Sequence, residues 1–186
     1  MNRRRAILAL IAAVLAALQT IVGLSPTAAQ AASQPAGRLV SDDPVGFTPH
    51  VLDGSVYAIA QVGNTVILGG SFSQTRSSSD PTVVNRSRLV AFNATTGVIS
   101  TTFLPNPNGT INAIVPAADG TSIYVGGSFS SIAGSAVKNL ARITVADGSL
   151  VAGFDGGSPT GQVKDLKLAN GRLWVGGTFT HIRGRA

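Results

Sequence analysis

Short runs of alternating apolar and polar residues recur along the chain in the same order. The most regular run is an apolar triplet followed by two glycines, and then by a phenylalanine flanked by serine or threonine. It occurs three times, with the second and third copies separated by about 50 residues. The copies are Val66–Leu68 before Gly69 and Gly70, Ile123–Val125 before Gly126 and Gly127, and Leu173–Val175 before Gly176 and Gly177. The chain is therefore predicted to be a repeat protein.

Each triplet is predicted to be the second strand of a β-hairpin. Another strand-like run precedes it, beginning at Val56, Ile111 or Val163. The two runs are separated by residue pairs that favour tight hairpin turns. These pairs are Gly63-Asn64, Asp119-Gly120 and Asn170-Gly171.

A second hairpin is predicted after each of the first two. The run Arg88–Phe103 matches Asn139–Phe154, with Gly97 and Gly148 at equivalent turns. Four strands in about 50 residues is the size of one β-propeller blade. The sequence therefore predicts an all-β fold, a partial β-propeller of four-stranded antiparallel blades with about two and a half repeats. The units lie near 56–103, 111–154 and 163–186, and the first has a longer loop over residues 73–85.

The repeated phenylalanines are expected to be buried at equivalent places. One set follows the glycine pairs and the other ends the predicted fourth strands. The residues are Phe72, Phe129 and Phe179, and Phe47, Phe103 and Phe154. Phe47 is expected to end a strand whose own blade lies elsewhere in the chain. The glycine pairs are expected to allow a bend or bulge where blades crowd together.

The first 31 residues are predicted to be a signal peptide. Arg3, Arg4 and Arg5 precede an almost wholly apolar segment, residues 6–24, and Ala29-Gln30-Ala31 offers a small-residue cleavage pattern. The alternative is a retained membrane anchor, since the apolar segment is nearly long enough to span a bilayer. The two adjacent arginines leave open either general or twin-arginine export. Residues 32–45 are predicted to be a linker and 46–186 an incomplete propeller, in a protein that is secreted or at the cell surface.

Charge and cysteine content narrow the partners. The whole chain has a net charge of +6, and removal of the three leader arginines leaves 11 − 8 = +3. No basic run with interleaved aromatic residues remains, which argues against nucleic-acid binding. The absence of cysteine excludes disulfides, thiolate catalysis and cysteine-ligated metal.

The middle unit resembles a delta-60 repeat. The stretch INAIVPAADGTSIYVGGSFSSIAGSAVKNLARITVADGSLVAGF carries the resemblance, which extends over roughly residues 45–186. The glycine pair after an apolar strand is also similar to kelch blades, but the separate Tyr and Trp of kelch are missing, and there is no Trp-Asp pair as in WD40 repeats. The resemblance implies a β-propeller of an exported bacterial protein with a surface role, and it supplies no catalytic motif.

Residues with reactive side chains are few and scattered. His50 and His181 are the only histidines, and Asp42 and Asp43 precede a proline as in a linker. No catalytic, cofactor-binding or metal residue is predicted, and no cofactor. Four cations near the predicted third strands form at most a weak anion-binding surface, with a solvated face as the alternative. These are Arg86, Arg88, Lys138 and Arg142.

The function expected from the sequence is that of an exported, non-catalytic propeller acting as a binding or surface scaffold. Its ligand is expected to be an extracellular carbohydrate or protein, and its only contact with the membrane is expected through the signal peptide. The alternative is the amino-terminal part of a secreted propeller enzyme with catalytic residues beyond Ala186. A further expectation is that the chain is a fragment of a longer propeller.

Overall fold

The computed structural model describes residues 46–182. The chain divides into two parts, Met1–Pro44 and Val45–Ala186. We call the three repeats units 1, 2 and 3, in chain order. The predicted signal peptide (1–31), the predicted linker (32–45) and residues 183–186 lie outside the described part. Within the described part there is no helix, and hence none long and apolar enough to cross a membrane.

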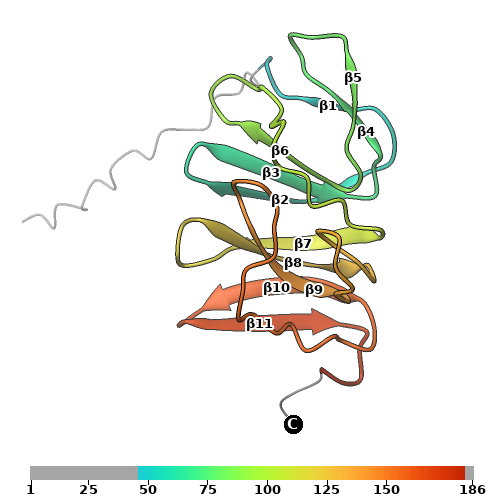
Figure 1. The fold of residues 1–186 in the computed structure, drawn as a ribbon, viewed down its shortest axis with the longest axis vertical. Coiled ribbons are helices and arrows are strands. Elements are labelled where there is room, and N and C mark those ends of the chain that lie inside the picture. Colours follow the sequence, from blue (N-terminus) through green and yellow to red (C-terminus); the bar gives the residue numbers. More distant parts are fainter. Residues whose placement is uncertain (1–45, 183–186) are drawn as a thin grey trace, which may run out of the picture. The chain divides into compact units, whose positions relative to one another are not determined.

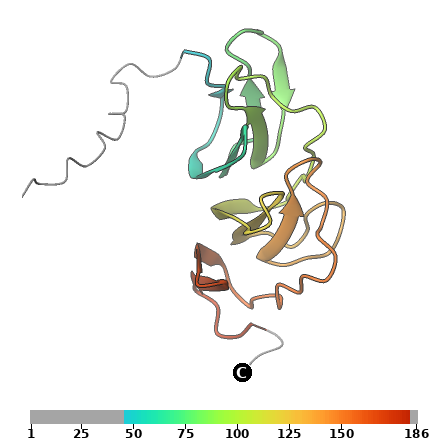
Figure 2. The same cartoon turned by 90° about the vertical axis from the view of Figure 1, so that its left-hand side faces the viewer.

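Three β-hairpins follow one another as separate layers, as the sequence predicts (Figures 1 and 2). The first pairs β2 (Val56–Val62) with β3 (Thr65–Gly70), the second pairs β7 (Thr110–Pro116) with β8 (Ser122–Ser128), and the third pairs β10 (Val163–Ala169) with β11 (Arg172–Gly177). A third antiparallel strand joins each of the first two hairpins. These strands are β6 (Leu89–Asn93) and β9 (Leu140–Thr144). The fold is all-β, as expected of a partial propeller.

The predicted fourth strand is reduced to a single bridge in each of the first two units. The bridges join Phe92 to Ile99 and Ile143 to Leu150. The chain then leaves its own sheet, because Thr102 Oγ1 donates to Ala146 O of the next unit at 2.9 Å. In the first unit this bond takes the place of further pairing, and each of the first two sheets has three strands rather than four.

The glycine pairs lie opposite a β-bulge in each hairpin. The strand register shifts between Val56 and Ala58 in the first unit, and at the equivalent places in the other two. A β-carbon on the second glycine, Gly70, would stand 1.9 Å from Ser55 O, and one on Gly127 would stand 2.0 Å from Thr110 O. No side chain fits such a close approach of two backbones, which is why glycine is required there.

The first glycine of the first two pairs instead faces the next unit. A β-carbon on Gly69 would stand 2.7 Å from Ile111 Cγ2, and one on Gly126 would stand 2.4 Å from Val163 Cγ1. The core lies largely between successive units as a result. The cluster between units 1 and 2 includes Ile67, Leu89, Phe103, Ile111, Ile123 and Val125.

Burial of the six repeated phenylalanines is only partly as expected. Phe72, Phe103 and Phe129 are buried. Phe47, Phe154 and Phe179 are half-buried. Phe154 and Phe179 pack at the contact between units 2 and 3, where fewer layers cover them, and the Phe154 ring lies edge-on to Tyr124 at 5.2 Å.

Phe47 lies in a turn with Gly46, and the segment before them, where the expected strand would lie, is outside the described residues. The segment after Phe47 does form a strand. It forms β1 (His50–Val51), which pairs with β4 (Gln74–Arg76), and β4 pairs with β5 (Val83–Asn85). The longer loop of the first unit therefore builds a hairpin that offers β1 a partner. Thr75 in β4 is fully buried, and Val51 packs against the cluster that contains Leu68 and Val90.

Candidate functional site

The extra residue of each bulge differs between units, although the residue before it is always a branched aliphatic one. These residues are Tyr57, Asn112 and Lys164, and all three line one open cavity of about 500 Å³. A bulge turns a side chain away from the regular alternation of its strand. Because the same bulge recurs in three layers, it brings a phenol, an amide and an ammonium group to one place.

The rest of the cavity lining is polar and uncharged. It consists of Thr110, Ser128 and Gln162. Ser71 Oγ donates to the Tyr57 hydroxyl at 3.4 Å, and Asn112 Nδ2 donates to Val163 O at 2.8 Å. Asn112 is thus held in place, while the side chains of Tyr57 and Lys164 are exposed. The cavity presents one cation, one aromatic ring and several hydroxyl and amide groups.

A second set of equivalent residues fixes the backbone beside the cavity. Asp53 Oδ1 accepts from the amides of Ser73 and Gln74 at 2.9 and 2.8 Å. In the next units, Asn108 Oδ1 accepts from two successive amides at 2.9 and 3.0 Å, and Thr160 Oγ1 accepts from two at 3.1 and 3.2 Å. Each residue precedes the glycine that opens its unit. We call Asp53, Asn108 and Thr160 the turn clamps.

The carboxylates of the described residues are engaged as hydrogen-bond acceptors. The Ser73 hydroxyl and amide and the Gln74 amide lower the pKa of Asp53. The Thr144 hydroxyl, followed by the Ser149 amide and hydroxyl, lowers the pKa of Asp147 to about 2. These groups are ionised acceptors at neutral pH, which is the opposite of a poised general acid.

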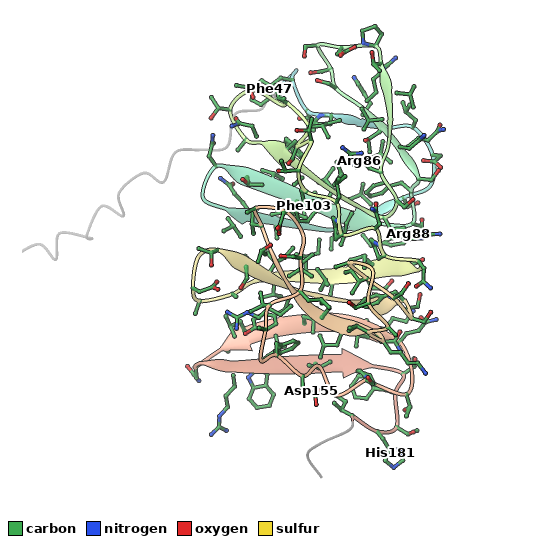
Figure 3. All side chains as sticks on the ribbon, in the orientation of Figure 1. Phe47, Arg86, Arg88, Phe103, Asp155 and His181 are labelled. Atoms are coloured by element: carbon green, nitrogen blue, oxygen red, sulfur yellow. The ribbon has the colours of Figure 1, made fainter. Side chains whose placement is uncertain are left out.

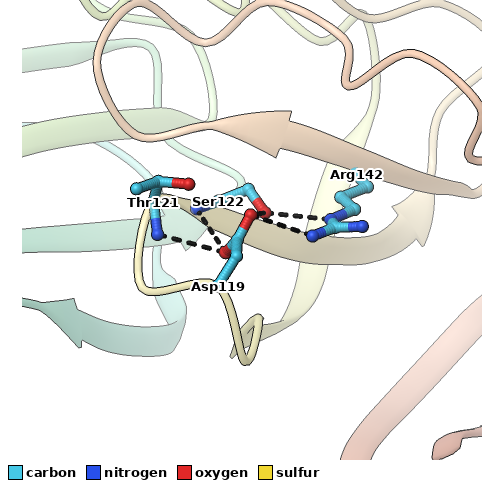
Figure 4. Close-up of polar contacts among 4 residues, drawn as sticks. All are labelled: Asp119, Thr121, Ser122 and Arg142. Atoms are coloured by element: carbon cyan, nitrogen blue, oxygen red, sulfur yellow. Dashed lines mark hydrogen bonds and ion pairs between the residues drawn. The ribbon is translucent and has the colours of Figure 1, made fainter.

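Asp119 is the most highly connected carboxylate. The Thr121 amide, the Ser122 hydroxyl and the Ser122 amide hold its pKa well below the usual range. Arg142 Nη2 lies 2.9 Å from Asp119 Oδ2, and Arg142 Nε donates to Ser122 Oγ at 2.9 Å (Figure 4). The guanidinium also stacks over the Tyr124 ring at 5.3 Å. This network ties the β7–β8 turn to β9.

The four cations considered as an anion-binding surface have separate surroundings. Arg86 Nη2 donates to Ser100 O at 3.3 Å, and Arg88 Nη1 donates to Pro107 O at 3.2 Å (Figure 3). Arg142 is paired with Asp119, and Lys138 is exposed beside Asn139. Arg86 and Arg88 therefore bind backbone carbonyls of neighbouring segments, and the four cations do not form a common patch.

The two histidines also lie apart from each other. His50 is in β1, and the His181 ring Nδ1 lies 3.0 Å from Thr180 Oγ1 near the end of the described chain (Figure 3). Residues 46–182 contain no group of three His, Asp or Glu side chains placed to hold a metal ion. Asp42 and Asp43 lie outside the described residues.

Sequence reasoning missed both the bulge residues and the turn clamps. The bulge residues were hidden because the strand runs were compared for what they share. Their signal is a polar or aromatic residue, Tyr57, Asn112 or Lys164, directly after the branched aliphatic residue that begins each first strand. The clamps have a signal too, since each directly precedes the glycine before a first strand.

Comparison with known proteins agrees with the fold. A family model described as a domain of unknown function (DUF5122) beta-propeller matches residues 118–154. This segment contains β8 and β9 of the middle unit. Searches of curated proteins and of solved structures gave no match. The repeated hairpins and the family match together show a propeller-type repeat protein.

Proposed function

We propose that this chain is an exported, non-catalytic propeller that binds a carbohydrate in the cavity lined by Tyr57, Asn112 and Lys164. The single observation that carries the proposal is the convergence of these three bulge residues on one cavity. A repeated scaffold that brings different side chains from equivalent positions to one cavity has the arrangement expected of a ligand site.

The chemistry of the cavity favours a sugar over a protein surface. An exposed Tyr57 ring offers a face on which a pyranose stacks, and the amides and hydroxyls match sugar hydroxyl groups. A volume of about 500 Å³ suits one or two sugar rings. Lys164 adds a positive charge, so a sugar that bears a carboxylate is preferred over a neutral one.

The non-catalytic part of the proposal rests on how the carboxylates are used. Asp53, Asp119 and Asp147 each accept several hydrogen bonds that stabilise their ionised forms. A general acid or base needs a pKa closer to neutral. These aspartates hold turns, and none of them lines the cavity.

Export and a delta-60 type of surface protein complete the proposal. They are supported by the charged and apolar order of residues 3–24, the Ala29-Gln30-Ala31 pattern and the resemblance of the middle unit. Mass spectrometry of secreted material tests export. A chain that begins at Ala32 is expected, whereas a membrane fraction that retains residues 1–24 would contradict it.

The binding proposal is tested by calorimetric titration with uronic-acid oligosaccharides and with neutral glucose oligosaccharides. Tyr57→Ala is expected to weaken binding of both. Lys164→Gln is expected to weaken only the uronate, by about tenfold, or ~1.4 kcal/mol. Lys167→Gln is the matched control, since Lys167 is exposed on the same strand and does not line the cavity. Absence of binding to either sugar, or an equal loss with the control, would overturn the proposal.

A further inference from the structure

The outer faces of the first and last hairpins in the stack of three hairpins are more exposed than the faces between hairpins. Val56 is 37% exposed and Ile59 is 67% exposed, and we call these two residues the leading face. Their equivalents in unit 2, Ile111 and Ile114, are 0% and 8% exposed. Val163 and Leu166 of unit 3 are equally buried. The same strand position is thus covered in units 2 and 3 and open in unit 1.

The opposite side of unit 3 shows the complementary difference. A β-carbon on Gly176 would meet nothing closer than Asp165 at 3.9 Å, whereas the space beside Gly69 and Gly126 is occupied by side chains of the following unit. Trp174 is 60% exposed on the same face, since it pairs with Lys167 and Gly176 pairs with Asp165. We call Asp165, Lys167, Trp174 and Gly176 the trailing face.

We propose that the trailing face of one copy binds the leading face of a second copy, with Val56 of the second copy packed against Gly176. The two faces are the halves of an interface that already occurs twice in the chain, as Gly69 against Ile111 and Gly126 against Val163. In both cases the first strand of one unit covers the first two strands of the unit before it.

The hairpin added to the first unit leaves this contact free. Val51 and the β4 residue Thr75 belong to the layer that covers the outer part of unit 1, where Leu68 and Val90 are buried. Val56 and Ile59 in β2 stay exposed. The closest backbone contacts between units run from the first strand of one unit to the first two strands of the unit before it, and β2, the first strand of unit 1, stays exposed.

The contact between copies is weaker than the contacts within the chain. Asp165 and Lys167 occupy the positions of the alanines Ala58 and Ala60 in unit 1. Desolvation of these charges lowers the gain from burying Trp174 and Ile59. The association is therefore a concentration-dependent equilibrium. Because unlike faces meet, it forms open chains or a closed ring.

Sedimentation velocity of the full chain over a range of concentrations tests the proposal. Gly176→Val fills the trailing face with a β-branched side chain, and Ile59→Lys places a charge on the leading face. Both positions are open in the single copy, so neither change disturbs the fold. Each variant alone is expected to lose the association. An equal mixture is expected to recover a dimer and nothing larger, since it contains one intact face of each kind.

The control is Val98→Lys, which places the same charge on an exposed apolar residue outside both faces. It is expected to associate as the unmodified chain does. A chain that stays monomeric at every concentration would overturn the proposal. So would single variants that still associate, a mixture that fails to recover the dimer, or a Val98→Lys variant that loses association as well.

Discussion

Gly126 and Val163 fit against each other so closely that a β-carbon on Gly126 would stand 2.4 Å from Val163 Cγ1. The same relationship joins Gly69 to Ile111, whose side chain atom Cγ2 would be 2.7 Å away. The space left by the absent side chain of each glycine is thus occupied by a branched side chain of the next unit. This repeated contact explains why glycine is required at Gly69 and Gly126.

Phe129 is expected to contribute strongly to stability, because it is 2% exposed in the core between units 1 and 2. Phe129→Ala should lower the free energy of unfolding by about 3–5 kcal/mol. Phe154→Ala is the comparison, since Phe154 is half-buried and should cost less. Urea unfolding followed by circular dichroism measures both, and equal losses would contradict this description of the core.

The turn clamp Asn108 is expected to act through its side-chain oxygen. Asn108→Ala removes the acceptor for the amides of Ser130 and Ser131 and should cost about 1–2 kcal/mol. Asn108→Asp keeps that acceptor and copies the arrangement of Asp53 in unit 1, so it should remain close to the parent. Chemical unfolding of the two variants measures the difference. A loss with Asp as large as that with Ala would show that the oxygen is not the stabilising group.

Acid is expected to destabilise the fold by protonating the aspartates that hold its turns, Asp53, Asp119 and Asp147. The pKa of Asp147 is lowered in the fold from 3.8 to about 2, and the pKa values of Asp53 and Asp119 are lowered as well. A lowered pKa means that the stabilisation is complete above pH 3.8 and is lost as the pH falls toward 2. Melting temperatures at successive pH values should fall in this window. Asp147→Asn should make that fall shallower, and an unchanged slope would exclude Asp147 as a contributor.

The repeat could be predicted from sequence because its signals are local. Turn pairs such as Asp119-Gly120, the apolar triplets and the glycine pairs are each set by backbone geometry within a few residues. The predicted fourth strand is only a single bridge in the structure. In the first unit Thr102 bonds to Ala146 of the next unit, and this bond depends on packing between units. The pairing of β1 with β4 was missed because it joins segments that are far apart in the sequence.

The candidate site was harder to predict than the scaffold. Tyr57, Asn112 and Lys164 share no chemistry, and only the bulge shows that they face one cavity. The four cations lie near the third strands of the first two units, but Arg88 and Arg142 are bound to different groups. Side-chain direction after a bulge follows from the register, which the sequence does not show.

Substitution of equivalent glycines tests the central claim, that successive units dock through the first glycine of each pair. Gly126→Ala and Gly176→Ala make the same chemical change at the same strand position. Only Gly126 faces a following unit. The free energy of unfolding should be measured for both at a concentration where the chain is monomeric. We predict that Gly126→Ala lowers it by about 1–3 kcal/mol, while Gly176→Ala changes it by less than about 0.5 kcal/mol. Equal effects of the two substitutions would contradict the account.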